Sequence, residues 1–294
     1  MIKRYSVVLL LFVGLLFSFG CARNAEVKSK PTVVVSILPL KYFVEKIADS
    51  TVQVKVLVPP GSSPEMYEPA PSQLVDFSTA DAYFAIGLLD FEKGLEPKLK
   101  DGYKAKYINL SEGANLMEGS CTHHGEEHAE GEHNHGVDPH IWVSVNEAKR
   151  IANVMLSILS EVYPEQKERF LANHSKLLAK IDSVNAAIQS TFAKSGTKAF
   201  LIYHPALGYF ARDYGITQLS IEEEGKNPSA GGIINTIKAS KEQGIKSVLS
   251  QSQFDIHNAQ AIASEIGGSV VKVDPLAENW DESMIQIAKA ISGE

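Results

Sequence analysis

Hydrophobic positions from residue 31 onward follow two alternating patterns. Short runs rich in β-branched residues are typical of buried strands, and between them apolar residues recur every three or four positions, as in amphipathic helices. The runs that predict strands are 32–38, 51–58, 82–87, 103–110, 198–203, 216–221, 246–250 and 268–274. The segments that predict helices are 40–49, 72–80, 204–215, 233–244, 256–266 and 281–291. This alternation predicts an α/β fold with mostly parallel sheets.

The middle of the chain, residues 144–193, has helical periodicity and no strand signal. One amphipathic stretch stops at Pro164, and a second begins there with proline at a favoured first-turn position. The second stretch carries an apolar stripe at positions 170, 171, 177, 178, 181, 184 and 188. We therefore expect a long helix that joins an N-terminal lobe, 31–143, to a C-terminal lobe, 194–294. His174 lies in a mainly polar part of this helix and is expected at the surface.

The first residues of the chain have the composition of a secretory signal. Two basic residues precede an apolar run that ends at Gly20, too short for a membrane-spanning helix of roughly 20 residues. We expect residues 1–20 to be a signal peptide. The small residue before Cys21 resembles a lipoprotein processing site, so we expect lipidation of Cys21 in preference to ordinary cleavage nearby. Residues 21–30 are polar and would act as a tether.

Composition narrows the possible partners. The formal net charge is −7 and the basic residues form no patch, which argues against nucleic acid as a partner. The two cysteines are Cys21 and Cys121, and with the first lipidated no internal disulfide supports the fold. The remaining chain is long enough for one large domain or two of ordinary size.

A histidine-rich segment, THHGEEHAEGEHNHG, covers residues 122–136. It holds five of the chain's nine histidines and no large apolar residue, so it cannot fold around a core of its own. The five are His123, His124, His128, His133 and His135. Imidazoles on a flexible loop bind metal ions and raise their local concentration. We expect this loop to be an auxiliary, low-affinity metal collector close to His140.

Four other polar residues lie beyond segments predicted as strands. Glu65 follows a strand across a Pro-Gly loop, and His140 follows the histidine-rich segment. His204 and Asp274 end two predicted strands of the C-terminal lobe. Ligands of open α/β sheets bind beyond the carboxyl ends of the strands, and two imidazoles with two carboxylates are a usual donor set for a divalent transition ion. Asp138 could orient the imidazole of His140 as a hydrogen-bond acceptor.

Three stretches carry a family resemblance: PGSSPEMYEPAPSQ at 60–73, DPHIWVSVNEAKRIA at 138–152 and HPALGYFARDYGI at 204–216. Together, and in this order, they resemble the solute-binding lipoproteins of the zinc and manganese ABC importers, the cluster A-I or ZnuA-like family. The resemblance runs from about residue 31 to the end. It implies two α/β lobes bridged by one long rigid helix, with one metal ion held between the lobes.

The resemblance also implies the metal ligands, which fall on Glu65, His140, His204 and Asp274. At the first position the family usually has histidine, whereas this chain has Glu65. At the third position manganese members typically have Glu and zinc members His, so His204 is zinc-like. Intrinsic affinity at sites with nitrogen and oxygen donors favours Zn²⁺ over Mn²⁺. We therefore favour zinc, with Mn²⁺ or Fe²⁺ as the alternative.

The function implied by the resemblance is capture of Zn²⁺ and its delivery to the permease of an ABC importer. The protein would be a monomer outside the cytoplasm, anchored by lipid to the cell membrane or facing the periplasm, and would not be an enzyme. A secreted zinc hydrolase is an alternative, but neither HExxH nor HxxEH occurs, and four protein ligands would leave no place for an activated water. A siderophore or haem receptor would instead have an apolar or basic pocket.

Overall fold

The computed structural model describes residues 30–119, 136–222, 228–254 and 256–294. The expected signal peptide 1–20, the lipidation site Cys21 and all five histidines of the auxiliary loop lie outside these ranges. None of the helices in the described ranges combines the length and the apolar character needed to cross a membrane.

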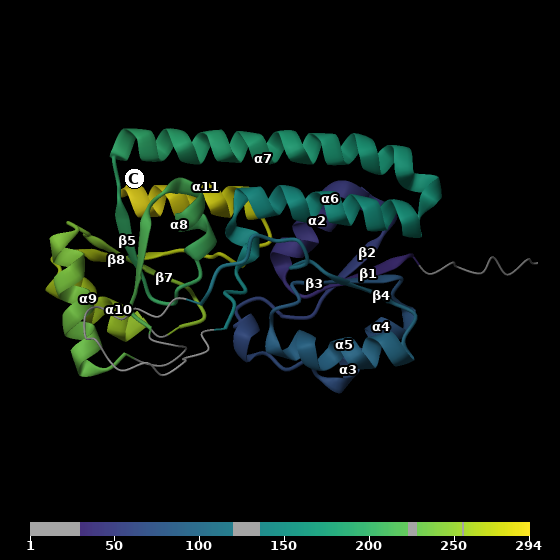
Figure 1. Cartoon of the computed structure of the whole chain (residues 1–294), viewed down its shortest axis with the longest axis horizontal. Coiled ribbons are helices and arrows are strands. Elements are labelled where there is room, and N and C mark those ends of the chain that lie inside the picture. Colours follow the sequence, from purple (N-terminus) through teal and green to yellow (C-terminus); the bar gives the residue numbers. More distant parts are fainter. Residues whose placement is uncertain (1–29, 120–135, 223–227, 255) are drawn as a thin grey trace, which may run out of the picture. The chain divides into compact units, whose positions relative to one another are not determined.

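The N-terminal lobe is built on a sheet of four parallel strands in the order β2-β1-β3-β4 (Figure 1). The strands are β1 (Thr32–Val35), β2 (Gln53–Val56), β3 (Ala82–Ala85) and β4 (Lys106–Asn109). Every residue of β1 and β3 is buried, as expected for central strands covered on both faces. The helices of this lobe are α2 (Leu38–Ala48), α3 (Pro71–Leu74), α4 (Asp76–Thr79) and α5 (Asp90–Gly102).

The second sheet has the same arrangement, although no repeat is evident in the sequence. Its four strands are also parallel, in the order β6-β5-β7-β8. They are β5 (Ala199–Ile202), β6 (Thr217–Ser220), β7 (Ser247–Ser250) and β8 (Ser269–Lys272). The helices here are α8 (Gly208–Tyr214), α9 (Ala230–Glu242), α10 (Ile256–Glu265) and α11 (Trp280–Ser292). The prediction of two α/β lobes with parallel sheets is confirmed.

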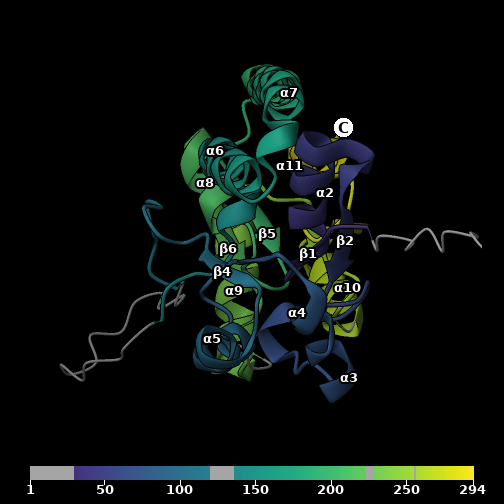
Figure 2. The same ribbon diagram turned by 90° about the vertical axis from the view of Figure 1, so that its right-hand side faces the viewer.

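Two long helices connect the lobes. They are α6 (Val145–Val162) and α7 (Lys167–Ser195), with the 3-10 turn η4 (Pro164–Gln166) between them. The 29 residues of α7 span about 44 Å at about 1.5 Å per residue, and α7 runs past α2, α6 and α11 (Figures 1 and 2). The prediction of a long connecting helix is therefore confirmed.

The expected surface position of His174 on α7 is wrong. Its side chain is only 7% exposed. His174 lies four residues after Phe170 and three before Leu177, so helical geometry places it on the buried face of α7. Burial lowers the pKa of His174, which keeps the imidazole neutral inside the helical layer.

Helix α5 has no counterpart in the sequence prediction. Its sequence, DFEKGLEPKLKDG, contains glycine and an internal Pro97, both of which disfavour a helix. The start of α5 is stabilised by the buried Glu92, whose carboxylate accepts backbone N–H groups of Ile86, Gly87 and Leu89. These contacts at the start of the helix, with the burial of Phe91, Leu95 and Leu99, thus outweigh the low helix propensity of the sequence.

One hydrophobic core extends across both lobes. On β5, Phe200 and Ile202 face the core that continues into the N-terminal lobe, whereas Leu201 faces a smaller core beneath α9 and α10. Trp142 and Trp280 join the lobes further: Nε1 of Trp280 donates to the carbonyl of Trp142 at 2.7 Å, and Nε1 of Trp142 donates to that of Pro275 at 2.8 Å. The contact between the lobes is therefore tightly packed.

Candidate metal centre

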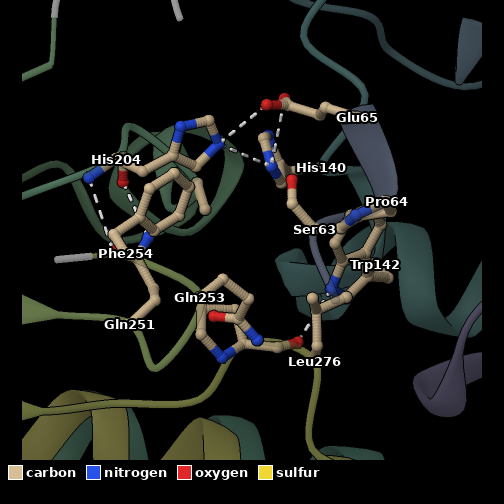
Figure 3. Close-up of a pocket in the computed structure, with 12 residues that line it drawn as sticks. Ser63, Pro64, Glu65, His140, Trp142, His204, Gln251, Gln253, Phe254 and Leu276 are labelled. Carbon is tan, nitrogen blue, oxygen red and sulfur yellow. Dashed lines mark hydrogen bonds and ion pairs between the residues drawn. The ribbon is translucent and has the colours of Figure 1, made fainter. Parts of the chain in front are cut away.

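Glu65, His140 and His204 come together where the two lobes meet (Figure 3). Nε2 of His204 lies 3.4 Å from Nε2 of His140 and 3.2 Å from Oε2 of Glu65. Nε2 of His140 lies 3.6 Å from Oε1 of Glu65. Four ligands at about 2.0–2.2 Å from a tetrahedral zinc ion are about 3.3–3.6 Å apart. The spacing of these three donors therefore fits one such ion.

Each of the three side chains comes from a short segment at the end of a larger element. Glu65 lies in the 3-10 turn η2 (Pro64–Met66), which follows the loop after β2. His140 directly precedes the 3-10 turn η3 (Ile141–Val143) that leads into α6. His204 follows β5 at the carboxyl end of the second sheet, as predicted for a ligand of an open α/β sheet.

A carboxylate orients each imidazole from behind. Nδ1 of His140 is 2.7 Å from Oδ1 of Asp138, and Nδ1 of His204 is 2.7 Å from Oε2 of Glu222. A hydrogen bond at Nδ1 fixes the ring orientation and leaves Nε2 for a metal. The role proposed for Asp138 therefore agrees with its position.

Glu222 was not identified from the sequence. It opens a run of three glutamates, which is typical of a solvated loop, yet its side chain is buried. A weak signal was present, because Glu222 lies two residues past the end of β6 and parallel neighbouring strands β5 and β6 end at the same edge. The sequence alone did not distinguish it from the glutamates that follow.

The loop after β7 completes the support of His204. Gln251 donates from Nε2 to the carbonyl of His204 at 2.8 Å and accepts from its N–H at 3.4 Å. The ring of Phe254 stacks on the imidazole, with centroids 4.8 Å apart and planes 17° from parallel. These residues, together with Trp142 and Leu276, wall a cavity of about 20 Å³ beside the donors. That space holds about one water molecule.

The charges in the cluster strongly perturb its titration. Burial alone would raise the pKa of Glu65, but the hydrogen bond to His204 and the charges of both histidines outweigh it and hold the pKa at about 2. Burial would lower the pKa of His204, but hydrogen bonds to Glu222 and Glu65 raise it to about 9. The metal-free cluster therefore holds a proton on His204 at neutral pH, which an incoming cation has to displace.

Asp274, the fourth predicted ligand, does not lie in this cluster. Its exposed side chain accepts the N–H of Leu276 at 3.0 Å and lines a neighbouring cavity beside the turn 59–62. Gln253 and Leu276 border both cavities. The structure thus brings together three of the four predicted ligands.

The residues that flank the histidines of the histidine-rich segment are described, up to Gly119 before them and from Gly136 after them. Glu118 and Val137 form an antiparallel bridge, and the N–H of Asp138 donates to the carbonyl of Met117 at 2.9 Å. The described chain on either side of the histidines therefore meets beside Asp138, the residue that orients His140.

Comparisons with known proteins relate this chain to zinc-uptake proteins. Residues 33–292 match a family model described as zinc-uptake complex component A, periplasmic. The chain is 28% identical over 288 residues to the high-affinity zinc uptake system protein ZnuA of Bacillus subtilis (strain 168), an alignment that covers 94% of this chain and 90% of that protein.

Two further similarities extend this result. The zinc-binding protein AdcA of Streptococcus pyogenes is 25% identical over 299 residues, covering 96% of this chain, but the chain spans only 58% of AdcA. A solved structure of a ZnuA deletion mutant with zinc bound is 35% identical, with a TM-score of 0.80, and the match covers 89% of this chain and 96% of that one. With the family model matched along residues 33–292, the chain belongs to the ZnuA family of periplasmic zinc-uptake components.

Proposed function

We propose that this protein captures Zn²⁺ outside the cytoplasm and delivers it to the permease of an ABC importer. The observation that carries the proposal is the cluster of Glu65, His140 and His204, whose donor atoms have the spacing of ligands around one tetrahedral ion. Membership of the ZnuA family supports transport as the purpose of this binding.

Zinc is the proposed cargo in preference to Mn²⁺ or Fe²⁺. Two of the three clustered donors are imidazole nitrogens, and affinity at such sites rises from Mn²⁺ and Fe²⁺ towards Zn²⁺. The cavity of about 20 Å³ has room for about one water molecule, which disfavours a haem or a siderophore.

The identity of the fourth ligand is part of the proposal. To bind the same ion, the carboxylate of Asp274 would have to leave the N–H of Leu276 and move past Leu276 and Gln253. We expect Asp274→Asn to weaken zinc binding about as much as removal of His140, if this movement occurs. Binding within about twofold of the native protein, measured by competition with a chromophoric chelator, would instead leave the fourth position to water or to a histidine of the loop.

Lipidation at Cys21 and a monomeric state complete the proposed picture. Acyl attachment would hold the protein at the membrane that contains the permease, with residues 21–30 as a tether. Incorporation of a labelled fatty acid into the native protein, and its loss in Cys21→Ser, would test the anchor. Sedimentation of the zinc-loaded protein would test the monomeric state.

Equilibrium dialysis of the metal-free protein with zinc, followed by metal analysis, tests the central claim. One tight equivalent is expected, and His140→Ala combined with His204→Ala should remove it. A double variant that retained the tight equivalent would contradict the proposed site. Diffraction at the zinc and manganese absorption edges would identify the bound ion and its ligands directly.

Extra, weaker equivalents are expected from the histidine-rich segment. Deletion of residues 122–136 should remove them and leave the tight equivalent unchanged, because Glu65, His140 and His204 lie outside the deleted segment. Loss of the tight equivalent in the same dialysis measurement would mean that a loop histidine is one of its ligands.

A further inference from the structure

Helix α8 begins four residues after His204 and lies beside α6 (Figures 1 and 2). It also contacts η3, the turn that directly follows His140. It belongs to the C-terminal lobe by its place in the chain. Its side chains, however, bond to the segments that flank His140.

The first contact lies on the N-terminal side of His140. The hydroxyl of Tyr209 donates to the carbonyl of Asp138 at 2.8 Å and accepts the N–H of Met117 at 3.1 Å. Tyr209 is fully buried. Its hydroxyl therefore joins the two chain segments that meet at Asp138. Oδ1 of Asp138 accepts both the backbone N–H of His140 at 2.9 Å and its Nδ1–H at 2.7 Å.

The second contact is a close approach of Gly208 to the carboxylate of Asp138, which is possible because glycine has no side chain. A Cβ built on Gly208 would lie 2.8 Å from Oδ2 of Asp138, closer than van der Waals contact allows. Because Oδ1 of the same carboxylate is held by His140, Asp138 cannot rotate away without changing the orientation of the imidazole. Glycine at position 208 thus allows α8 to approach the carboxylate closely.

The third contact lies on the C-terminal side of His140. Oδ2 of Asp213 accepts the hydroxyl of Ser144 at 2.5 Å, and Ser144 is the N-cap of α6. Between Asp138 and Ser144 the chain carries His140, so the two ends of this short segment are both held by one helix of the other lobe.

We propose that α8 is an interlobe clamp, in which Gly208, Tyr209 and Asp213 position the His140 imidazole for metal binding. This inference rests on the proposed function, because it assumes that His140 is a ligand. The clamp also links the two histidines mechanically, since α8 follows His204 by four residues and holds the His140 segment at both ends.

The test compares two hydroxyls on the same helix. Tyr209→Phe removes the hydroxyl that holds Asp138, whereas Tyr214→Phe removes a hydroxyl that donates to Oδ1 of Asn185 on α7, away from the His140 segment. Zinc affinity is measured by chelator competition on the purified native protein and each variant. The visible spectrum of the Co²⁺-loaded proteins reports the ligand geometry.

Tyr209→Phe should weaken zinc binding about tenfold or more and alter the Co²⁺ spectrum, as loss of an orienting partner does at other metal sites. Tyr214→Phe should leave affinity within about twofold and the spectrum unchanged. Equal weakening in both variants would mean that α8 acts only through general stability, and would overturn the clamp.

Gly208→Ala keeps every hydrogen-bonding group and places a residue with higher helix propensity in α8, so it should fold. It should weaken zinc binding about tenfold by displacing the carboxylate of Asp138. The clamp is refuted if both Gly208→Ala and Tyr209→Phe bind zinc within about twofold of the native protein with an unchanged Co²⁺ spectrum. If the native protein fails to bind zinc, or His140→Ala binds as tightly as native, the proposed function itself fails.

Discussion

Each of the two histidines of the metal centre has a carboxylate as its immediate partner, but the residues that hold the two histidines in place differ. Each donates from Nδ1 to a buried carboxylate at 2.7 Å. Apart from the other two donors of the cluster, the described partners of His204 come from loops of its own sheet: Glu222 after β6, and Gln251 and Phe254 after β7. His140, in contrast, depends on Tyr209 of the other lobe through Asp138.

This difference assigns distinct roles to the two halves of the site. His204 is oriented by one sheet and should stay in place if the lobes shift slightly. The position of the His140 segment should depend on the contact between the lobes, because α8 and Pro275, both of the C-terminal lobe, are hydrogen-bonded to it. Loss of these contacts would therefore allow His140 to move relative to His204.

The largest effect is expected when either imidazole is removed, whatever its support. A structural zinc site contributes about 10–16 kcal/mol over four ligands, so loss of one ligand should weaken binding by about 100-fold or more. His140→Ala and His204→Ala should both show this in chelator competition. His257→Ala, at an exposed position on α10, is the control and should bind as the native protein does.

The next effect is on pH dependence, and it belongs to the His204 half. Because burial is outweighed by hydrogen bonds to Glu222 and Glu65, the pKa of His204 is about 9, and zinc binding must displace that proton. Apparent affinity should fall about tenfold for each pH unit below about 9 and level off above it. Glu65, with a pKa of about 2, stays ionised throughout this range.

Glu222→Gln should change that pH profile, since it replaces a carboxylate that raises the pKa of His204 with a neutral amide. The range over which zinc affinity depends steeply on pH should end at a lower pH than in the native protein. A native profile that is flat between about pH 6 and pH 9 would contradict the protonated state inferred for His204.

The smallest effect separates the two supports from each other. Asp138→Ala and Glu222→Ala, which remove the acceptors of the two Nδ1–H groups, should each weaken zinc binding about tenfold at fixed pH. Adding Tyr209→Phe should cost little further in the Asp138→Ala background, because the carboxylate that Tyr209 positions is already gone, and should add its full effect in the Glu222→Ala background. Additivity in both double variants, measured as a double-mutant cycle, would show that Tyr209 does not act on His140 through Asp138.

The strands and the long helix were predictable because their patterns are strong and local. Runs such as TVVV and AYFA are completely buried, and the stripe on α7 repeats at helical spacing. Helix α5 was not predictable, because its start depends on Glu92 and its sequence contains Pro97. The burial of His174 could have been deduced from its spacing to Phe170 and Leu177, but its polarity suggested the surface.

The metal centre was predictable only in part. Its two histidines and Glu65 lie in distinctive motifs at the ends of elements. Glu222 and Gln251 act through long-range contacts, 18 and 47 residues from His204, which no local pattern reveals. The sequence placed Asp274 correctly beyond β8, but its position beside the turn 59–62, outside the cluster, depends on how distant segments pack together.

The hydrophobic core that runs through both lobes has a thermodynamic consequence. Lobes that share one core should lose their structure in a single cooperative transition, so an ion bound where they meet protects residues far from it. At a thousandfold excess of zinc over its dissociation constant, the added free energy of unfolding is about 4 kcal/mol. Amide hydrogens along the whole of α7 should then exchange more slowly, including those at the end most distant from the metal.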